Sequence, residues 1–486
     1  MSRSVYAERY ADLTSAFGRL RPGQDLTVAS GLKLWAVVGR SLVLRGVASG
    51  RVACAPLQPA GRVATLRAEL HGPQLGGRVA LRQSAAGSGL LSQLYHVTPA
   101  RRDSLHRWAL LRGDCERGEP VPSPVEGPLA AGRAPGVLTG RTFVSWNGML
   151  DGALSIVIYG DKDTASIAAC APLRPIEPRQ AVANWTDLGG TVLLRQDSPY
   201  DATLVTVQFR REAVRKAYSY GIDELPTISR GEIGVMCPNV RGVIYNPLGV
   251  SADRVPSPGE GSFEQYAVGD LSGKYGPLGE NSAVEFVQVH DPYLTLFGPY
   301  SVVGRSAVVF RPDGVPLACA NIALEGVKLL TAVATFDTPV QGQAIFQQAM
   351  GQSDVWMYVE LSHPEPGGET YGHTWSVHER LVRTGSRLSS AWCADAGSVY
   401  NPYNVTTTAG YECQCSALAP ERCVAGDLSG RLDTLDIPPF SSGRLAQYMF
   451  TDPGIELSQL LERSLVLGGP DFSDTPLACT NILAHN

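Results

Sequence analysis

Residues 302–309, which read Val-Val-Gly-Arg-Ser-Ala-Val-Val, decide the fold because the chain repeats them. Related stretches, each followed by a cysteine, are Val37–Leu44 with Cys54, Ala153–Ile158 with Cys170, Val302–Val309 with Cys319, and Arg463–Leu467 with Cys479. Their apolar runs are typical of β-strands. A phrase that recurs along a chain predicts repeated structural units.

The composition also favours many short strands. The 486 residues include 52 Gly and 34 Pro, and 18% are charged. This balance favours turns over long surface helices, and the length suggests about three or four domains. The net charge is −5 with no basic tract, which argues against nucleic-acid binding. No apolar run approaches the roughly 20 residues that a membrane span needs.

Two further phrases recur in a fixed order. The first opens each unit, and its copies are Leu75–Gln83, Leu188–Gln196 and Val340–Gln348, followed by the strand-like runs Leu90–Val97, Ala202–Phe209 and Val355–Leu361. Each pair predicts a β-hairpin, because apolar alternation continues on both sides of a turn. The second phrase contains Gly-Asp-Leu-Ser-Gly and occurs at Tyr266–Lys274 and Cys423–Arg431.

The order of the phrases predicts the units. Complete units are expected at 59–174, 175–323 and 324–486, which we call units two, three and four. Residues 1–58 are the back half of a first unit, in which Tyr10–Leu13 aligns with the Gly-Asp-Leu phrase. We therefore expect the chain to be a fragment of a longer protein or an incomplete gene model; a true cytosolic start at Met1 is the alternative.

The three phrases closely resemble copper/zinc superoxide dismutases. Val302–Val309 is similar to the late strand of that family, and Tyr266–Lys274 to its Gly-Asp-Leu-Gly segment. The organisation resembles that of the animal copper-only SOD-repeat proteins, which carry several such domains in one secreted or membrane-anchored chain. The resemblance implies an all-β chain of tandem Greek-key β-barrels, with three complete units and an N-terminal half unit.

The family resemblance also implies a disulfide in each complete unit. The implied pairs are Cys115–Cys170, Cys237–Cys319 and Cys393–Cys479. We expect Cys54 to have lost its partner with the missing half of its unit. Cys413, Cys415 and Cys423 are additional: one of the first two can pair with Cys423 and leave an odd thiol. A local disulfide is favoured over a metal thiolate site, because no second cysteine pair is near.

Two observations favour an extracellular or cell-surface chain. Several of the ten cysteines recur at matching places, which suggests disulfides. Asn184-Trp-Thr and Asn404-Val-Thr are glycosylation sequons. The N-terminal stretch lacks a signal peptide, and we expect that signal to have been lost with the missing part of the chain.

The copper-binding positions implied by the resemblance hold almost no ligands. Twelve such positions can be aligned: Arg45 in the half unit; Ala109, Leu111 and Tyr159 in unit two; Gly221, Asp223, Ile244 and Phe310 in unit three; and Ser376, His378, Val399 and Gly468 in unit four. Copper that cycles between oxidation states prefers imidazole ligands. His378 is the single histidine among the twelve.

The remaining site positions implied by the resemblance are also altered. Asp270 and Asp427 match the zinc aspartate of the family, but Ala267 and Val424 replace the neighbouring histidine. An aspartate in this phrase also serves turn hydrogen bonding. The substrate-guiding arginine corresponds to Arg51, Ile167, Pro316 and Pro476, so it is kept in the half unit.

His373 and His378 are the nearest candidates for metal ligands. They lie five residues apart, which places them on opposite faces of a regular strand. His106 precedes Trp108 as His373 precedes Trp375, so this histidine is interpreted as a structural feature of the repeat. His363 can join them only where a loop folds back.

The sequence therefore predicts a non-catalytic extracellular array with no cofactor. Its role is binding or structural, with an unknown protein partner or with a second copy of itself. Two alternatives stay open: a copper-dependent superoxide dismutase, and a low-affinity copper binder that uses His363, His373 and His378. No Gly-x-Ser-x-Gly motif supports a hydrolase.

Overall fold

The structure is a computed structural model. It describes residues 41–46, 50–56, 63–71, 75–84, 89–99, 107–120, 127–128, 138–145, 154–160, 163–209, 219–228, 237, 240–277, 286–363, 369–383, 390–407, 410–412, 415–417, 420–439 and 445–485. Tyr10–Leu13, His106 and Cys413 lie outside the described residues.

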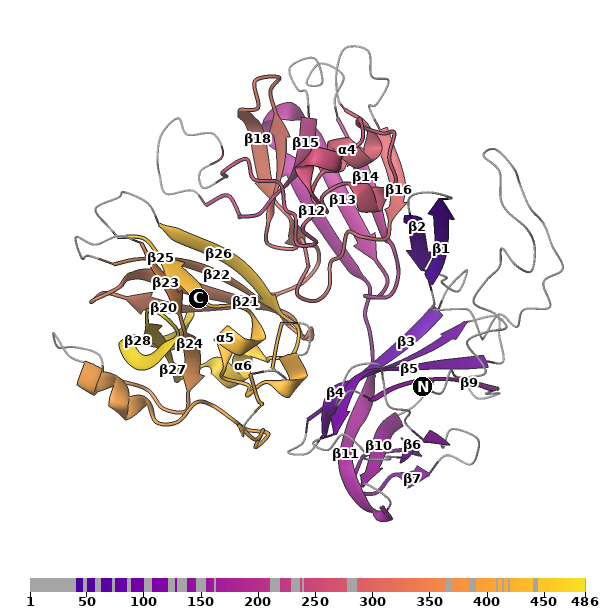
Figure 1. The fold of residues 1–486 in the computed structure, drawn as a ribbon, viewed down its shortest axis with the longest axis vertical. Coiled ribbons are helices and arrows are strands. Elements are labelled where there is room, and N and C mark those ends of the chain that lie inside the picture. The colour runs from indigo at the N-terminus through magenta and orange to yellow at the C-terminus, as the bar shows by residue number, and fades with distance from the viewer. Residues whose placement is uncertain are drawn as a thin grey trace.

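The described chain is all-β (Figure 1). Its α-helices are single turns: α4 (Leu271–Tyr275), α5 (Leu428–Arg431) and α6 (Leu457–Leu460). No helix of the described residues is long and apolar enough to cross a membrane. The expected all-β class is therefore confirmed.

The N-terminal hairpin and unit two hold the first strands. β1 (Ser41–Gly46) pairs with β2 (Gly50–Pro56). A nine-stranded sheet follows, built from β3 (Val63–Leu70), β4 (Leu75–Ser84), β5 (Gly89–Pro99), β6 (Arg107–Arg112), β7 (Glu119–Pro120), β8 (Gly127–Pro128), β9 (Leu138–Ser145), β10 (Leu154–Gly160) and β11 (Asp163–Pro175). Leu81, Trp108 and Ile156 lie in the buried core of unit two.

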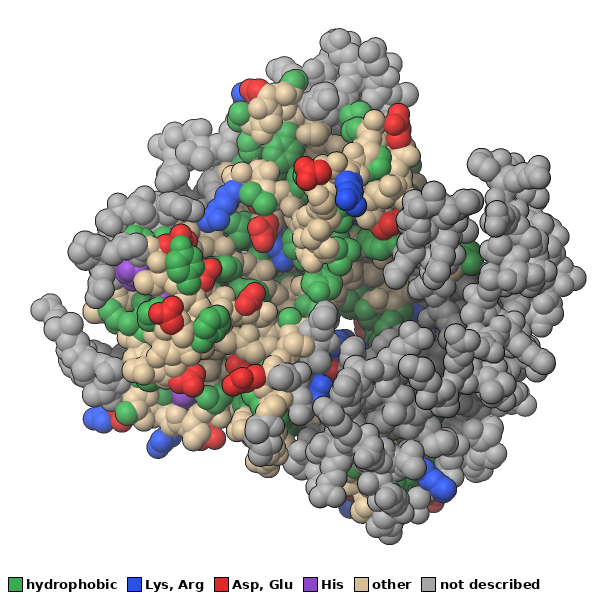
Figure 2. Space-filling view, viewed as in Figure 1, with side chains coloured by type: hydrophobic (Ala, Val, Ile, Leu, Met, Phe, Trp, Pro, Cys, Tyr) green, Lys and Arg blue, Asp and Glu red, His purple; other side chains and the backbone are tan. Residues whose placement is uncertain are grey.

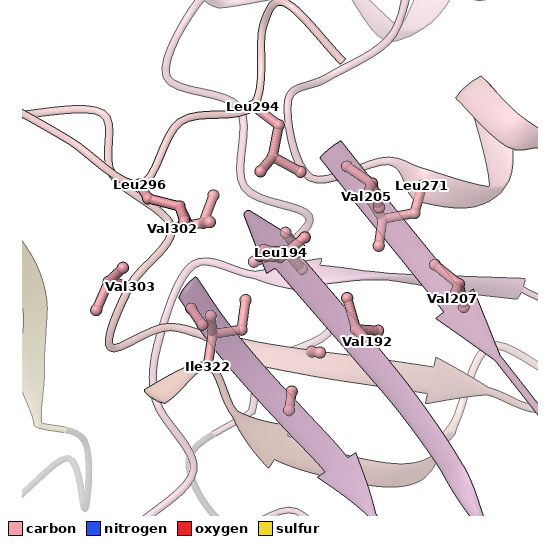
Figure 3. Close-up of a cluster of buried hydrophobic side chains, with 14 of the residues drawn as sticks. Val192, Leu194, Val205, Val207, Leu271, Leu294, Leu296, Val302, Val303 and Ile322 are labelled. Carbon is pink, nitrogen blue, oxygen red and sulfur yellow. The ribbon is translucent and has the colours of Figure 1, made fainter. Parts of the chain in front are cut away.

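Unit three has two sheets that face one core. The five-stranded sheet has the order β16 (Phe286–Asp291), β14 (Thr203–Gln208), β13 (Gly190–Gln196), β12 (Arg179–Trp185) and β19 (Ala323–Leu324). The three-stranded sheet is β15 (Ser219–Asp223), β17 (Ser306–Phe310) and β18 (Pro316–Asn321). Alternate residues of β13 and β14 are buried, and Val192, Leu194, Val205 and Val207 point toward Leu271 and Leu294 (Figure 3).

Unit four follows the same plan. Its seven-stranded sheet has the order β24 (Trp375–His378), β27 (Arg463–Gly469), β28 (Ser473–His485), β20 (Leu329–Phe336), β21 (Gln341–Ala349), β22 (Val355–Ser362) and β26 (Ala446–Asp452). β23 (Thr370–His373) pairs with β25 (Leu435–Ile437). Non-consecutive neighbours such as β22 and β26 show that the chain crosses between the strand groups.

Four disulfides join the described residues. They are Cys115–Cys170, Cys237–Cys319, Cys393–Cys479 and Cys415–Cys423. The first three are the pairs that the family resemblance implied, and the fourth is one of the two alternatives for the additional cysteines. Each of the first three ties a distant loop to the strand that pairs with the recurrent phrase, over 55, 82 and 86 residues.

A buried ion pair supports the Gly-Asp-Leu-Ser-Gly phrase in units three and four. Lys274 Nζ lies 2.7 Å from Asp291 Oδ2. Arg431 donates to both carboxylate oxygens of Asp452, at 2.6 and 2.7 Å. All four side chains are at most 3% exposed. These pairs anchor the phrase to an edge strand in each unit. That strand is β16 in the five-stranded sheet of unit three and β26 in the seven-stranded sheet of unit four.

Removing one partner from such a pair leaves a buried charge without compensation. We therefore expect Asp452→Asn to lower the free energy of unfolding by about 3–5 kcal/mol, measured by urea unfolding followed by tryptophan fluorescence. The control is Asp395→Asn, which breaks the exposed pair with Arg383 and should leave the midpoint unchanged. Equal stability of the two variants would contradict this role for Asp452.

Candidate functional site

In unit three, three segments that are far apart in the sequence meet in a ring of backbone hydrogen bonds. The Ile222 N–H donates to Gly269 O at 2.8 Å, Tyr245 donates to Ile222 O at 2.9 Å, and Gly269 donates to Tyr245 O at 2.8 Å. The ring joins β15, the loop with Tyr245, and the Gly-Asp-Leu-Ser-Gly phrase. We call this arrangement the backbone ring.

Unit four contains the same backbone ring. Val377 donates to Gly426 O at 2.8 Å, Tyr400 donates to Val377 O at 2.9 Å, and Gly426 donates to Tyr400 O at 2.8 Å. A Cβ at Gly426 would lie 2.3 Å from Val377 O, and one at Gly269 would lie 2.5 Å from Ile222 O. Both places therefore require glycine, because a side chain there would enter the backbone of the ring.

The implied copper positions surround the ring. Gly221 and Asp223 flank Ile222 on β15, and Asp223 forms an isolated bridge with Ile244. In unit four, His378 on β24 forms the matching bridge with Val399. The fold thus brings together the positions that the family resemblance assigned to one metal centre.

The last implied position lies at a β-bulge in every copy of the recurrent phrase. The register pairs Val43 with Cys54, Val157 with Cys170, Val308 with Cys319 and Val466 with Cys479. Each ladder then shifts at the next positions, between Leu44 and Arg45, Ile158 and Tyr159, Val309 and Phe310, and Leu467 and Gly468. Bulges re-aim side chains beside active sites. Here the bulge is present four times with four different residues.

The side chains around the ring of unit three do not fit a copper centre. Gly221 has no side chain, and Ile244 and Phe310 have no donor atom. Asp223 is fully buried, and its Oδ1 accepts from the Leu225 N–H at 3.0 Å. Burial raises the pKa of this carboxyl despite the backbone hydrogen bonds that it accepts. Apolar side chains with one desolvated carboxyl are a poor ligand set for copper.

Unit four does not fit a copper centre either. Val399 has no donor atom. A Cβ at Gly468 would lie 2.1 Å from Thr374 Oγ1 and 2.4 Å from Ser473 O, so the present backbone has no room for an imidazole at this position.

In unit two, Ala109 and Leu111 are buried beside Val157 and offer no ligand atom.

His378 is held by protein groups on both ring nitrogens. Nε2 lies 3.0 Å from Ser376 Oγ, and Nδ1 lies 2.7 Å from Gly397 O. Ser376, at the first implied ligand position, therefore forms a hydrogen bond with His378, at the second. This network orients the imidazole at the end of β24, as a structural histidine does.

His373 is also tied to the protein, but the expected geometry was wrong. Thr374 separates β23 from β24, and these strands pair with β25 and β27 respectively. His373 and His378 therefore do not share one regular strand. His373 Nδ1 lies 2.9 Å from Gly468 O, and Nε2 lies 2.8 Å from Thr370 Oγ1.

His363 lies near His373. Burial lowers the pKa of His373, and the charge of His363 lowers it further. His363 is buried, and its Nε2 has no hydrogen-bond partner among the described residues. Within the same described residues, no three His, Cys, Asp or Glu side chains are grouped so that they could hold a metal ion.

The two aspartates at the implied zinc position cap helices. Asp270 Oδ1 accepts from the Gly273 N–H at 2.7 Å, at the start of α4. Asp427 Oδ1 accepts from the Gly430 N–H at 2.9 Å, and its Oδ2 accepts from the Tyr411 hydroxyl at 2.7 Å. This is the ordinary role of an N-cap aspartate.

The arginine of the recurrent phrase has a structural role that sequence reasoning missed. The Arg305 guanidinium carbon lies 3.7 Å from the ring centre of Tyr245, and that of Arg463 lies 3.7 Å from the ring centre of Tyr400. Each cation therefore stacks on the tyrosine of the backbone ring. The recurrence of Arg-Ser and of Tyr-Asn-Pro in both units was the available signal.

Both sequon asparagines are exposed. Asn184 lies on β12, and its Oδ1 accepts from Thr191 Oγ1 at 3.2 Å. Asn404 has a positive φ of 50°, in a turn closed by hydrogen bonds at 2.9 Å between the Asn401 side chain and the Val405 backbone.

Comparisons with known proteins give matches among solved structures. No family model and no curated protein match the chain. Among solved structures, the chain is similar to superoxide dismutase 5 from Candida albicans in its Cu(II) form, at 23% identity and a TM-score of 0.24, over 33% of this chain and 94% of that one. A mutant of the same protein matches at 21% identity and a TM-score of 0.24, over 32% and 92%.

The backbone ring predicts that Gly426→Ala is strongly destabilising. Its Cβ would meet Val377 O at 2.3 Å and Tyr400 N at 2.9 Å, so at least one ring bond must break. We expect a loss of about 3 kcal/mol or more, measured by urea unfolding. Gly326→Ala is the control: φ is +69°, nothing lies within 4 Å, and the cost is about 1–2 kcal/mol. Equal costs would contradict a close-packed ring.

Proposed function

We propose that this chain is a non-catalytic extracellular array of superoxide dismutase-like units, with boundaries at 1–58, 59–174, 175–323 and 324–486. The units serve a binding or structural role, toward a protein partner or a second copy of the chain. The main observation behind this proposal is the contrast between the repeated backbone ring and the side chains around it. The backbone ring recurs in units three and four, while glycine, isoleucine, phenylalanine and valine occupy the implied copper positions.

The disulfides and sequons support an extracellular location. Disulfides persist in oxidising compartments, and four of them join the described residues. Asn184 and Asn404 are exposed, as glycosylation requires. The disulfides and the exposed sequons both support the proposal that the chain is secreted.

Copper loading tests the absence of a copper centre. We expect the purified chain, incubated with copper sulfate and dialysed, to retain no stoichiometric copper by mass spectrometry and to remove no superoxide. The Candida albicans enzyme treated in parallel serves as the positive control. Copper-dependent superoxide removal at the rate of that control would overturn the proposal and favour the alternative, a working dismutase.

A low-affinity copper binder is the second candidate. The buried His363 Nε2 without a described hydrogen-bond partner, close to His373, favours it. Under this candidate, copper(II) gives a histidine-type paramagnetic resonance spectrum that His378→Ala and His363→Ala abolish. Under the main proposal, the wild-type chain and both variants give the same spectrum as free copper(II).

Glycosylation tests the extracellular location. Produced in a secreting eukaryotic cell behind an added signal peptide, the chain should carry glycans at both sequons. Asn184→Gln and Asn404→Gln should each remove one glycosidase-sensitive mobility step, and the double variant should remove both. A secreted and folded chain without any glycan would contradict this part of the proposal.

A further inference from the structure

Charged side chains of units two and four meet in a mostly buried cluster. Arg67 and Glu69 of β3 form an ion pair with side chains 14% and 22% exposed. Arg67 Nη2 also donates to Pro453 O of unit four at 3.2 Å. Figure 1 shows β3 and β4 of unit two facing unit four. These contacts join residues that are 386 positions apart in the sequence.

The electrostatics of this cluster involve all three complete units. Burial by itself lowers the pKa of Arg67, but Glu69, Tyr200 of unit three and Asp354 of unit four outweigh it and raise the pKa. Burial by itself raises the pKa of Glu69, but Arg67, His71 and Arg78 outweigh it and hold the pKa at about 2. Both groups are therefore charged at neutral pH, and each is stabilised by its neighbours.

A second set of contacts lies beside the cluster. Arg78 Nη2 of β4 lies 3.4 Å from Glu421 Oε2, a side chain that is 4% exposed. A Cβ on Gly76 would lie 2.8 Å from Glu421 O, so β4 packs against this turn of unit four. The His71 ring stacks on Tyr403, with centres 4.1 Å apart and planes within 11°.

Unit four is joined to unit three as well. Arg179 Nη1 lies 2.6 Å from Asp354 Oδ2, with side chains 3% and 1% exposed, and the same oxygen accepts from the Gly298 N–H at 2.8 Å. Ala349 and Trp356 of unit four belong to the buried core of unit three. This junction combines a buried ion pair with apolar packing.

The charges of the joined units are complementary. Residues 324–486 contain 18 Asp and Glu against 8 Lys and Arg, whereas residues 59–174 contain 9 against 13. Acidic side chains are frequent on the visible face of unit four (Figure 2). Opposite net charges favour the docking of unit two on unit four.

We infer that Arg67, Glu69 and Arg78 of unit two, with Glu421 and the Pro453 carbonyl of unit four, form an ionic clasp that closes the three units into one compact body. The array is then a rigid block and not a string of freely jointed domains. Each unit contacts both of the others, because Arg82 of unit two also forms an ion pair with Asp201 of unit three. This inference goes beyond the proposed function and holds whether or not the chain binds copper.

Small-angle X-ray scattering of the unmodified chain is the first test. A closed body of 486 residues should have a radius of gyration within a few ångströms of about 23 Å. A profile of separate, flexibly linked lobes with a clearly larger radius would overturn the clasp. This measurement needs no variant to fold.

A charge swap is the second test. Arg78→Glu and Glu421→Arg each place like charges together, so each should increase the radius of gyration. The double variant restores an opposite pair and should return the wild-type value. Mass spectrometry under non-reducing conditions confirms that the disulfides of each variant are formed. Single variants with folded units and a wild-type radius would overturn the clasp, as would a double variant that stays open.

Discussion

The backbone ring is the constraint on which the rest of units three and four depends. Three amide–carbonyl bonds connect a strand, a disulfide-bearing loop and the Gly-Asp-Leu-Ser-Gly turn, which lie far apart in the sequence. The closeness of these segments excludes any side chain at Gly426. Further contacts build outward from it: Arg463 stacks on Tyr400, Asp427 caps α5, and Arg431 pairs with Asp452.

The backbone ring can form with different side chains at the positions around it. Backbone hydrogen bonds are independent of side-chain identity, so the positions beside the ring are free to carry glycine, isoleucine or valine without opening it. The bulge after the recurrent phrase is likewise a property of the ladder and tolerates Arg45, Tyr159, Phe310 and Gly468. A fold does not by itself fix the chemistry of the side chains that it positions.

The sequence predicted the parts of the structure that side chains encode. Apolar alternation marked the strands, and the placement of cysteines within the repeats led through the family resemblance to Cys237–Cys319 and its equivalents. The backbone ring was not predictable, because a hydrogen bond between two backbone groups requires no particular side chain. The one sequence feature that the ring requires is a glycine where the segments pack closely, such as Gly426. The break at Thr374 was missed because alternation continues across it, while the pairing partners of β23 and β24 differ.

Amide hydrogen exchange at the ring tests the central claim most directly. We infer that backbone hydrogen bonds, and not a bound metal ion, hold these three segments together. Val377, Tyr400 and Gly426 donate the three ring bonds of unit four, so their amides should be among the slowest to exchange in that unit. We predict the same protection in the presence and absence of a strong chelator. Loss of protection at these three amides on chelation, with recovery on adding copper or zinc, would contradict the account.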